Sequence, residues 1–304
     1  MTPGATHATE TTDTTETTAP ETWTATHRGV GAYADVNGLR LYHETFEPTH
    51  AGAGRGGAAA ETRTLILLHG GLGSGEMFDP IIPALTAGRR VITVDLQGHG
   101  RTADIDRPFD LRSMAEDVAQ LVTSIGLERP DVLGYSLGGG VALQLATAHP
   151  ELVRRVVIVS AHADRDATYP ELRQQAMGLN AAAAEFMKGT PMYELYARVA
   201  PRPEDFGRLL DKMGEWIRSP FDYRREYASL QVPTLIACAD ADGAPVRHYV
   251  ELFESLGGNQ RDGNWDGSGR PEGGHALAVI PGETHYSIFA SPLLVAAAMA
   301  FLDR

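Results

Sequence analysis

The sequence predicts an α/β protein whose mostly parallel β-sheet is flanked by helices and carries a helical cap insertion. Three observations predict this fold class. Short apolar runs of the kind that form buried strands recur along the chain, and amphipathic helical patterns alternate with them. The alternation stops between residues 163 and 230, where helical patterns occur without a strand candidate, so the insertion is expected there.

The chain is expected to begin with a disordered tail and a β-hairpin. Residues 1–28 are rich in threonine and glutamate and nearly devoid of aliphatic side chains, so they cannot bury enough surface to offset the entropy of ordering. Residues 33–46, YADVNGLRLYHETF, alternate around Asn37-Gly38, which predicts two antiparallel strands joined by a tight turn. The Gly- and Ala-rich residues 50–63 predict a surface loop.

Apolar runs and helical patterns then follow one another. The last helix should begin at Ser291-Pro292, an N-cap followed by proline at the first helical position. Earlier helices are predicted at 111–126 and 245–258, where apolar side chains recur on one stripe. The buried strands are predicted at 64–70, 90–95, 131–136, 154–161, 233–240 and 275–282.

The composition excludes several classes of function. The formal net charge is -13 with a pI near 5.3, and no run of lysines or arginines could follow a phosphate backbone. Neither a nucleic acid nor an anionic membrane is therefore an expected partner. No apolar stretch reaches the roughly 18 residues of a membrane span.

The lone cysteine and the N-terminus indicate the compartment. Cys238 lies in the apolar run TLIACAD, which favours a buried and inert thiol, and a single cysteine excludes an internal disulfide. The first residues lack the charged start and apolar middle of a secretory signal. We therefore expect a cytoplasmic protein.

One stretch, DVLGYSLGGG (131–140), points to catalysis. It places Ser136 between Gly134 and Gly138, where an apolar strand enters and a helical pattern leaves. A serine at a sharp strand-to-helix turn adopts strained backbone angles, and the closeness of strand and helix leaves no room for a Cβ atom two residues away. An ordinary Gly-rich loop is the alternative, but this context favours a nucleophilic serine.

The chain resembles members of the α/β-hydrolase superfamily that have a serine nucleophile and a helical cap. The motifs LLHGG, DLQGHGRT, GYSLGGG and PGETHY follow one another in the family's order. The resemblance covers the chain from about residue 30 to its end. It implies an α/β-hydrolase fold with a core at 29–162 and 231–304 and a cap at 163–230.

The resemblance also implies a general base for Ser136. A serine hydroxyl becomes a good nucleophile when a histidine that is oriented by a carboxylate removes its proton. His285 follows the final strand, where the family's catalytic histidine resides. His275 precedes that strand at the wrong end of the sheet, and His162 opens the cap.

Two aspartates compete for the role of the acid. The family's usual pattern after the strand at 233–240 is Gly-x-x-Asp, and Ala239 takes the glycine's place in CADADG. Asp242 is then the match, and Asp240 is the alternative. Asp164 and Asp166 are more distant candidates, since some relatives place the acid after the preceding strand.

Acyl transfer also needs main-chain donors aimed at the developing oxyanion. The resemblance implies the N–H groups of Leu137 and Gly71. The loop HGGLGSGE lacks the Gly-Lys-Ser/Thr ending of a phosphate loop, so no nucleotide cofactor is expected. No metal site is expected at HADRD (162–166), because its spacing presents no common face for ligands.

The pocket walls are expected to come from Met77 and Phe78 of the oxyanion loop, from Tyr135 and Leu137, and from apolar cap side chains. A mainly apolar pocket suits small or medium uncharged acyl groups. The implied function is hydrolysis of a small-molecule carboxylic ester through an acyl-enzyme, without a cofactor. Lactone hydrolysis, perhydrolysis and C–C cleavage use the same triad, and a small-molecule receptor with slow turnover is the alternative from another class.

Overall fold

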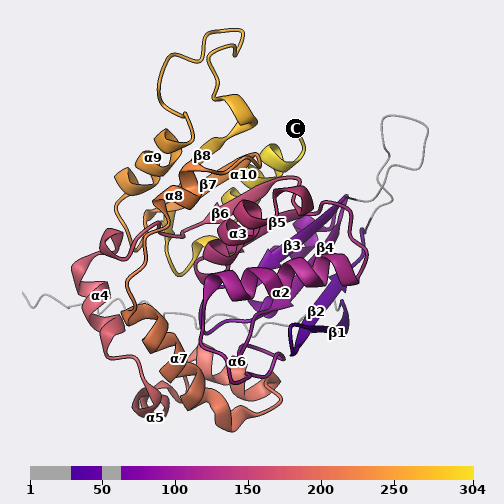
Figure 1. Cartoon of the computed structure of the whole chain (residues 1–304), viewed down its shortest axis with the longest axis vertical. Coiled ribbons are helices and arrows are strands. Elements are labelled where there is room, and N and C mark those ends of the chain that lie inside the picture. The colour runs from indigo at the N-terminus through magenta and orange to yellow at the C-terminus, as the bar shows by residue number, and fades with distance from the viewer. Residues whose placement is uncertain (1–28, 50–62) are drawn as a thin grey trace, which may run out of the picture.

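The computed structural model describes residues 29–49 and 63–304, and Figure 1 shows their sheet with helices on both faces. Its strand order is β1-β2-β4-β3-β5-β6-β7-β8. The pairs β1·β2 and β2·β4 are antiparallel and the other neighbours are parallel, so the predicted fold class is confirmed. The strands are β1 Val30–Val36, β2 Leu39–Phe46, β3 Thr64–Leu68, β4 Arg90–Asp95, β5 Asp131–Tyr135, β6 Val156–Val159, β7 Thr234–Ala241 and β8 Ala276–Thr284.

Strand β3 shows how the sheet separates two apolar cores. Ile66 and Leu68 are buried in one cluster, and Leu65 and Leu67 are buried in the other. Side chains alternate along a strand, so a run of consecutive apolar residues can fill both faces at once. This is why the strands could be predicted from apolar runs without alternation.

The helices divide between these two cores. Side chains from α2, α3, α8 and α9 belong to the cluster of Ile66, and those from α1 and α10 belong to the cluster of Leu65. The N-cap Ser291 of the last helix accepts a hydrogen bond from the N–H of Leu293, as its sequence predicts. The helices are α1 Ile82–Leu85, α2 Leu111–Ser124, α3 Leu137–Ala148, α8 Arg224–Ala228, α9 Val246–Ser255 and α10 Pro292–Leu302.

The segment 163–230, called the cap segment below, connects β6 to β7 mainly through helices. It is bound to the core at Asp104, which is nearly buried and accepts from Lys212 Nζ at 2.6 Å and from Arg208 Nε. Figure 1 shows α5, α6 and α7 together beyond one end of the sheet. Besides α8, the segment contains α4 Pro170–Met177, α5 Ala184–Met187, α6 Pro191–Val199 and α7 Phe206–Arg218.

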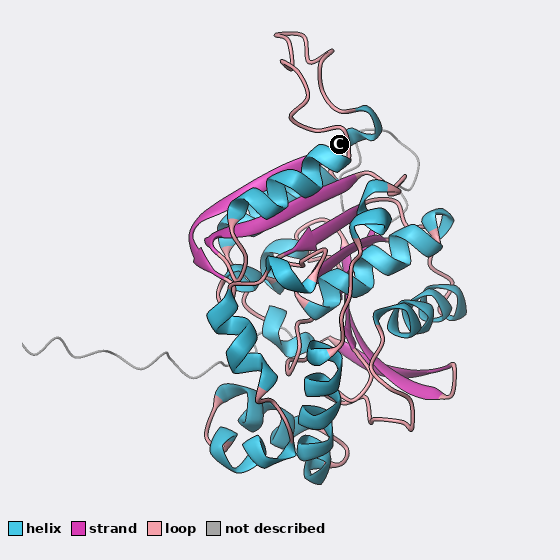
Figure 2. Cartoon of the chain, turned by 60° about the vertical axis from the view of Figure 1, so that its left-hand side comes forward, coloured by secondary structure: helices cyan, strands magenta, loops and turns pink. Residues whose placement is uncertain are grey.

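The long connection 257–274 lies at the other end of the molecule. It precedes β8 and extends away from the cap segment in both views (Figures 1 and 2). Trp265 in this connection is fully exposed, and none of the residues 257–274 lines the cavity beside Ser136. This connection therefore belongs to the solvent surface.

Two expectations fall on residues that the structure does not describe. The predicted tail at 1–28 and nearly all of the predicted loop at 50–63 lie outside the described residues, so both stay predictions. Within residues 29–49 and 63–304, no helix combines the length and apolar character that crossing a bilayer requires.

Candidate active site

Ser136 lies at a sharp turn between β5 and α3. Its backbone angles are φ 52° and ψ -113°, in a region that L-residues rarely adopt. Its N–H donates to the carbonyl of Val159 on the neighbouring strand at 2.9 Å. The strain is therefore held by the sheet, and it leaves the Ser136 side chain at the wall of a cavity.

The two glycines that flank Ser136 allow the strand and the helix to approach. A Cβ atom on Gly134 would lie 2.1 Å from the carbonyl oxygen of Gly138. A Cβ atom on Gly138 would lie 2.2 Å from the carbonyl oxygen of Leu68 in β3. Both clashes involve backbone atoms, which cannot move aside as a flexible side chain can, so the spacing of glycines is a steric requirement.

Replacing Gly138 with alanine is expected to lower the free energy of unfolding by ~1–3 kcal/mol, because the added methyl group overpacks the junction of α3 and β3. Urea unfolding measures this loss. Gly88→Ala is the matched control, since a Cβ atom there meets nothing within 4 Å. Equal unfolding midpoints for the two variants would contradict the close approach at Gly138.

Ser136, His285 and Asp242 form one chain of hydrogen bonds. His285 Nε2 lies 3.1 Å from Ser136 Oγ, and His285 Nδ1 lies 2.8 Å from Asp242 Oδ1. Each residue follows the C-terminal end of a strand, β5, β8 or β7 respectively. Because the C-terminal ends of parallel strands meet at one edge of the sheet, residues distant in sequence come together there.

The carboxylate of Asp242 is fully engaged. Burial alone would raise its pKa, but the hydrogen bond from His285 and further donors outweigh burial and lower the pKa to about 2. Oδ2 accepts from Ser160 Oγ at 2.5 Å and from the Ala239 N–H at 3.0 Å. Asp242 is thus ionised and fixed in orientation at neutral pH. Ser160 was missed in the sequence, where nothing distinguishes it from any serine that ends a strand.

The other carboxylates that the sequence left open have different partners. Asp240 is exposed and accepts from the N–H of Gly282 at 3.0 Å. Asp164 pairs with Arg224 at 3.0 Å, and Asp166 pairs with Arg173 at 2.5 Å. Among the aspartates weighed from the sequence, the structure brings only Asp242 against His285.

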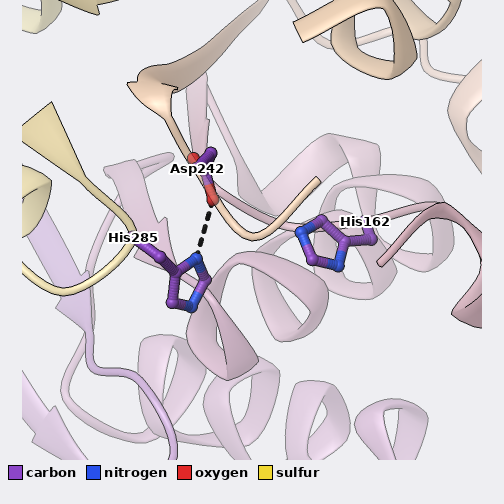
Figure 3. Close-up of side chains that lie close together, drawn as sticks. All are labelled: His162, Asp242 and His285. Carbon is purple, nitrogen blue, oxygen red and sulfur yellow. Dashed lines mark hydrogen bonds and ion pairs between the residues drawn. The ribbon is translucent and has the colours of Figure 1, made fainter. Parts of the chain in front are cut away.

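His162 is a second histidine beside this chain (Figure 3). Its Nδ1 lies 3.0 Å from Thr168 Oγ1, and its Nε2 is buried without a partner among the described residues. Burial lowers the pKa of His162 to about 4, so the ring is neutral at pH 7. The sequence placed His162 only at the start of the cap and did not predict its proximity to His285.

A metal ion is an alternative use of this cluster, because ligand atoms of His162, Asp242 and His285 all lie within 4.8 Å of one another. Two histidines and one carboxylate are suitable ligands for zinc. However, the facing Asp242 and His285 atoms already bond to each other, and the second Asp242 oxygen has two donors. A metal would have to break these bonds, so the observed arrangement favours a hydrogen-bonded role over a metal site.

Gly71 and Leu137 both line the cavity beside Ser136. Neither main-chain N–H donates to a protein acceptor within the ranges that the structure describes. His69 holds the loop that contains Gly70 and Gly71. Its Nε2 accepts a hydrogen bond from the Leu96 N–H at 3.0 Å, so the proton of the neutral ring lies on Nδ1. Nδ1 donates this proton to the carbonyl of Gly70 at 2.7 Å. The N–H groups of Gly71 and Leu137 are thus candidate donors for an oxyanion at Ser136.

His99 packs against His69, and the pH dependence of stability tests whether His99 is buried in its neutral form. Its ring centroid lies 5.1 Å from that of His69, and burial lowers the pKa of His99 to about 3. The unfolded state, with a pKa of about 6.5, binds the proton more tightly. Stability that is fully present above pH 6.5 is therefore lost as the pH falls towards 3, by about 1.4 kcal/mol per pH unit.

His99→Asn is expected to remove this part of the pH dependence. Between pH 7 and pH 5, the free energy of urea unfolding should fall by about 2 kcal/mol less in the variant than in the parent protein. Asp95, whose pKa burial raises to about 6, opposes the trend but is present in both proteins and cancels. Equal losses in the two proteins would contradict a buried neutral His99.

The cavity beside Ser136 measures about 400 Å³ and is lined mainly by apolar side chains. Tyr135 and Leu137 contribute as predicted, together with Met213 and Trp216 of the cap segment. The expectation for Met77 and Phe78 was wrong. The short 3-10 helix at 75–78 buries Phe78 in the apolar cluster of Leu65, and Met77 packs against that cluster, so neither side chain lines the cavity.

Comparisons with known proteins agree on the architecture. A family model described as the alpha/beta hydrolase fold matches residues 63–191. A Yersinia enterocolitica protein named "Putative carbamate hydrolase RutD" is 30% identical over 253 residues, which cover 77% of this chain and 88% of that protein.

Two further relatives broaden the comparison. A pimeloyl-(acyl-carrier protein) methyl ester esterase of Neisseria meningitidis is 40% identical over 119 residues, or 38% of this chain and 44% of the relative. The crystal structure of an enol-lactonase from Burkholderia xenovorans LB400 has a TM-score of 0.65 at 20% identity, covering 90% of this chain and 100% of that one. At this identity the structural likeness concerns the fold alone.

Proposed function

The chain belongs to the α/β-hydrolase superfamily and is a hydrolytic enzyme, and we propose on that premise that it cleaves carboxylic esters through an acyl-enzyme on Ser136. The observation that carries the proposal is the hydrogen-bonded chain from Ser136 Oγ through His285 to Asp242 at the wall of an apolar cavity. A nucleophile, a base and an orienting carboxylate are the groups that acyl transfer requires.

The chemistry follows from the orientation of His285. Because Asp242 accepts the proton on Nδ1, Nε2 has a free lone pair that can take the proton of the Ser136 hydroxyl. The Ser136 oxygen attacks the ester carbonyl, and the N–H groups of Gly71 and Leu137 donate to the resulting oxyanion. His285 then protonates the departing alcohol, and water repeats the sequence to release the acid.

Tyr135 holds His285 in place in addition to Asp242. The hydroxyl of Tyr135 donates to the main-chain carbonyl of His285 at 2.5 Å, and the two rings lie 5.4 Å apart. Burial raises the pKa of Tyr135, so this hydroxyl keeps its proton and remains a donor. Together with Asp242, Tyr135 limits the movement of the imidazole during proton transfer.

The names of the relatives favour acyl chemistry without fixing the substrate. They include a carbamate hydrolase and a methyl ester esterase, and both a carbamate and an ester contain a carbonyl group. The apolar cavity supports esters with small to medium acyl groups. Lactones remain a related substrate class with the same mechanism.

The direct test is a panel of para-nitrophenyl esters from acetate to octanoate, assayed beside a set of lactones. We expect Ser136-dependent hydrolysis that is fastest for short or medium acyl chains. Cys238→Ala is the control, because burial raises the pKa of this thiol to about 12 and it should be dispensable. An absence of hydrolysis across the whole panel would contradict the proposal.

A further inference from the structure

The charges at the cavity differ from those of the chain as a whole. The chain has 39 acidic and 26 basic side chains, yet no aspartate or glutamate lines the cavity within the described ranges. Two arginines line it, Arg165 and Arg173. Two arginines and no carboxylate at the cavity of an acidic protein call for a specific explanation.

The two arginines differ in their partners. Arg173 pairs with Asp166 at 2.5 Å, so its charge is compensated. Arg165 is only partly exposed, and no carboxylate of the described residues lies within ion-pair distance of it. A guanidinium that is partly withdrawn from water favours an anionic partner, because burying an unpaired charge is costly.

Contacts within the protein use only some of the hydrogen-bond donors of Arg165. It donates through Nη1 to the carbonyl of Arg218, the last residue of α7, at 2.5 Å, and through Nη2 to Met177 Sδ at 3.6 Å. These contacts occupy two of the five N–H donors of a guanidinium. The remaining donors have no partner among residues that the structure describes.

We infer that Arg165 binds a carboxylate of the substrate, so that the natural ester carries one negative charge apart from the bond that is cleaved. This inference rests on the proposed function and names the substrate class of the same site. The planar guanidinium matches a carboxylate, and one uncompensated positive charge matches a monoanion. The apolar walls then contact the hydrocarbon between the ester and the carboxylate.

This inference changes the expectation from the sequence. The apolar side chains predicted an uncharged acyl group, whereas the cavity combines apolar walls with a cation on the cap segment. The carboxylate can belong to the acyl part or to the alcohol part of the ester. The test therefore includes one probe of each kind.

The experiment compares three esters in the parent protein and in Arg165→Gln. The neutral ester is para-nitrophenyl butyrate, and the anionic esters are mono-para-nitrophenyl glutarate and para-carboxyphenyl butyrate. For at least one anionic ester, kcat/KM should fall about 10- to 100-fold in the variant, mainly through KM. Hydrolysis of the neutral ester should stay within about twofold. Ratios between parent and variant cancel the intrinsic reactivity of each ester.

Two controls separate recognition from a structural effect. Arg165→Lys keeps the charge and should restore part of the preference for the anionic ester. Arg224→Gln removes an arginine that pairs with Asp164 in the same segment and does not line the cavity, so it should change none of the three rates. If all three esters lose activity equally in Arg165→Gln, or if none loses activity, the inference is wrong.

Binding gives an answer that does not depend on turnover. In a Ser136→Ala background, calorimetry with the same anionic esters should show weaker binding when Arg165 is also replaced by glutamine. If the neutral ester is hydrolysed, but Arg165→Gln changes neither the kcat/KM nor the binding of the anionic esters, the inference fails and the proposed function stands. If no ester is hydrolysed while Arg165 still strengthens binding of the anion, the proposed function fails and the anion site stands.

Discussion

Ser136→Ala is expected to lower turnover of an activated ester by about 10⁶-fold while the fold is retained. The nucleophile and its base act as a unit, so removing the hydroxyl abolishes the acyl-enzyme route and leaves only the weak effects of binding and of the oxyanion donors. Steady-state kinetics measures the loss, and circular dichroism confirms that the variant is folded.

A serine outside the cavity serves as the control. Ser113 bonds to Asp110 at the start of α2 and does not line the cavity, so Ser113→Ala should keep full activity. Near-native turnover in a folded Ser136→Ala protein would show that this serine is not the nucleophile.

Asp242→Asn is expected to lower turnover by about 10⁴-fold with little change in structure. An amide at this position favours the wrong tautomer of His285 and cannot stabilise the imidazolium that forms as the serine is deprotonated. The hydrogen bond at 2.8 Å and the low pKa of Asp242 support this role for the carboxylate.

Asp240→Asn is the matched control for this prediction. Asp240 is two residues away, but it is exposed and bonds only to the N–H of Gly282 among the described residues. Turnover should change by less than about tenfold, because an amide oxygen can accept the same bond. A large loss at 240 combined with a small loss at 242 would reverse the assignment of the acid.

The fold could be predicted because its signals are local. Apolar runs mark the strands, and Asn37-Gly38 marks the hairpin, where the φ angles are 46° and 79° in the structure. The strained backbone angles of Ser136 could also be predicted, because the two glycines that indicate them lie two residues before and two residues after it. Each of these signals is carried by residues within a few positions of one another.

The surroundings of the site could not be predicted, because they depend on contacts between distant segments. Ser160 supports Asp242 across 82 positions of sequence, and only the pairing of β6 with β7 brings them together. Whether Arg165 has a carboxylate partner depends on how the cap segment folds over the sheet. Phe78 was misplaced because the short 3-10 helix at 75–78 turns it into the apolar core instead of the cavity, and the sequence does not reveal that direction.

The central claim is that Ser136 is the nucleophile, and covalent labelling tests it most directly. The protein is incubated with a fluorophosphonate, and the adduct is located by mass spectrometry of the intact chain and of its peptides. We predict one adduct per chain, on Ser136, which appears as ester hydrolysis is lost and is absent from Ser136→Ala. Labelling at another residue, or continued hydrolysis by a protein fully labelled on Ser136, would contradict the claim.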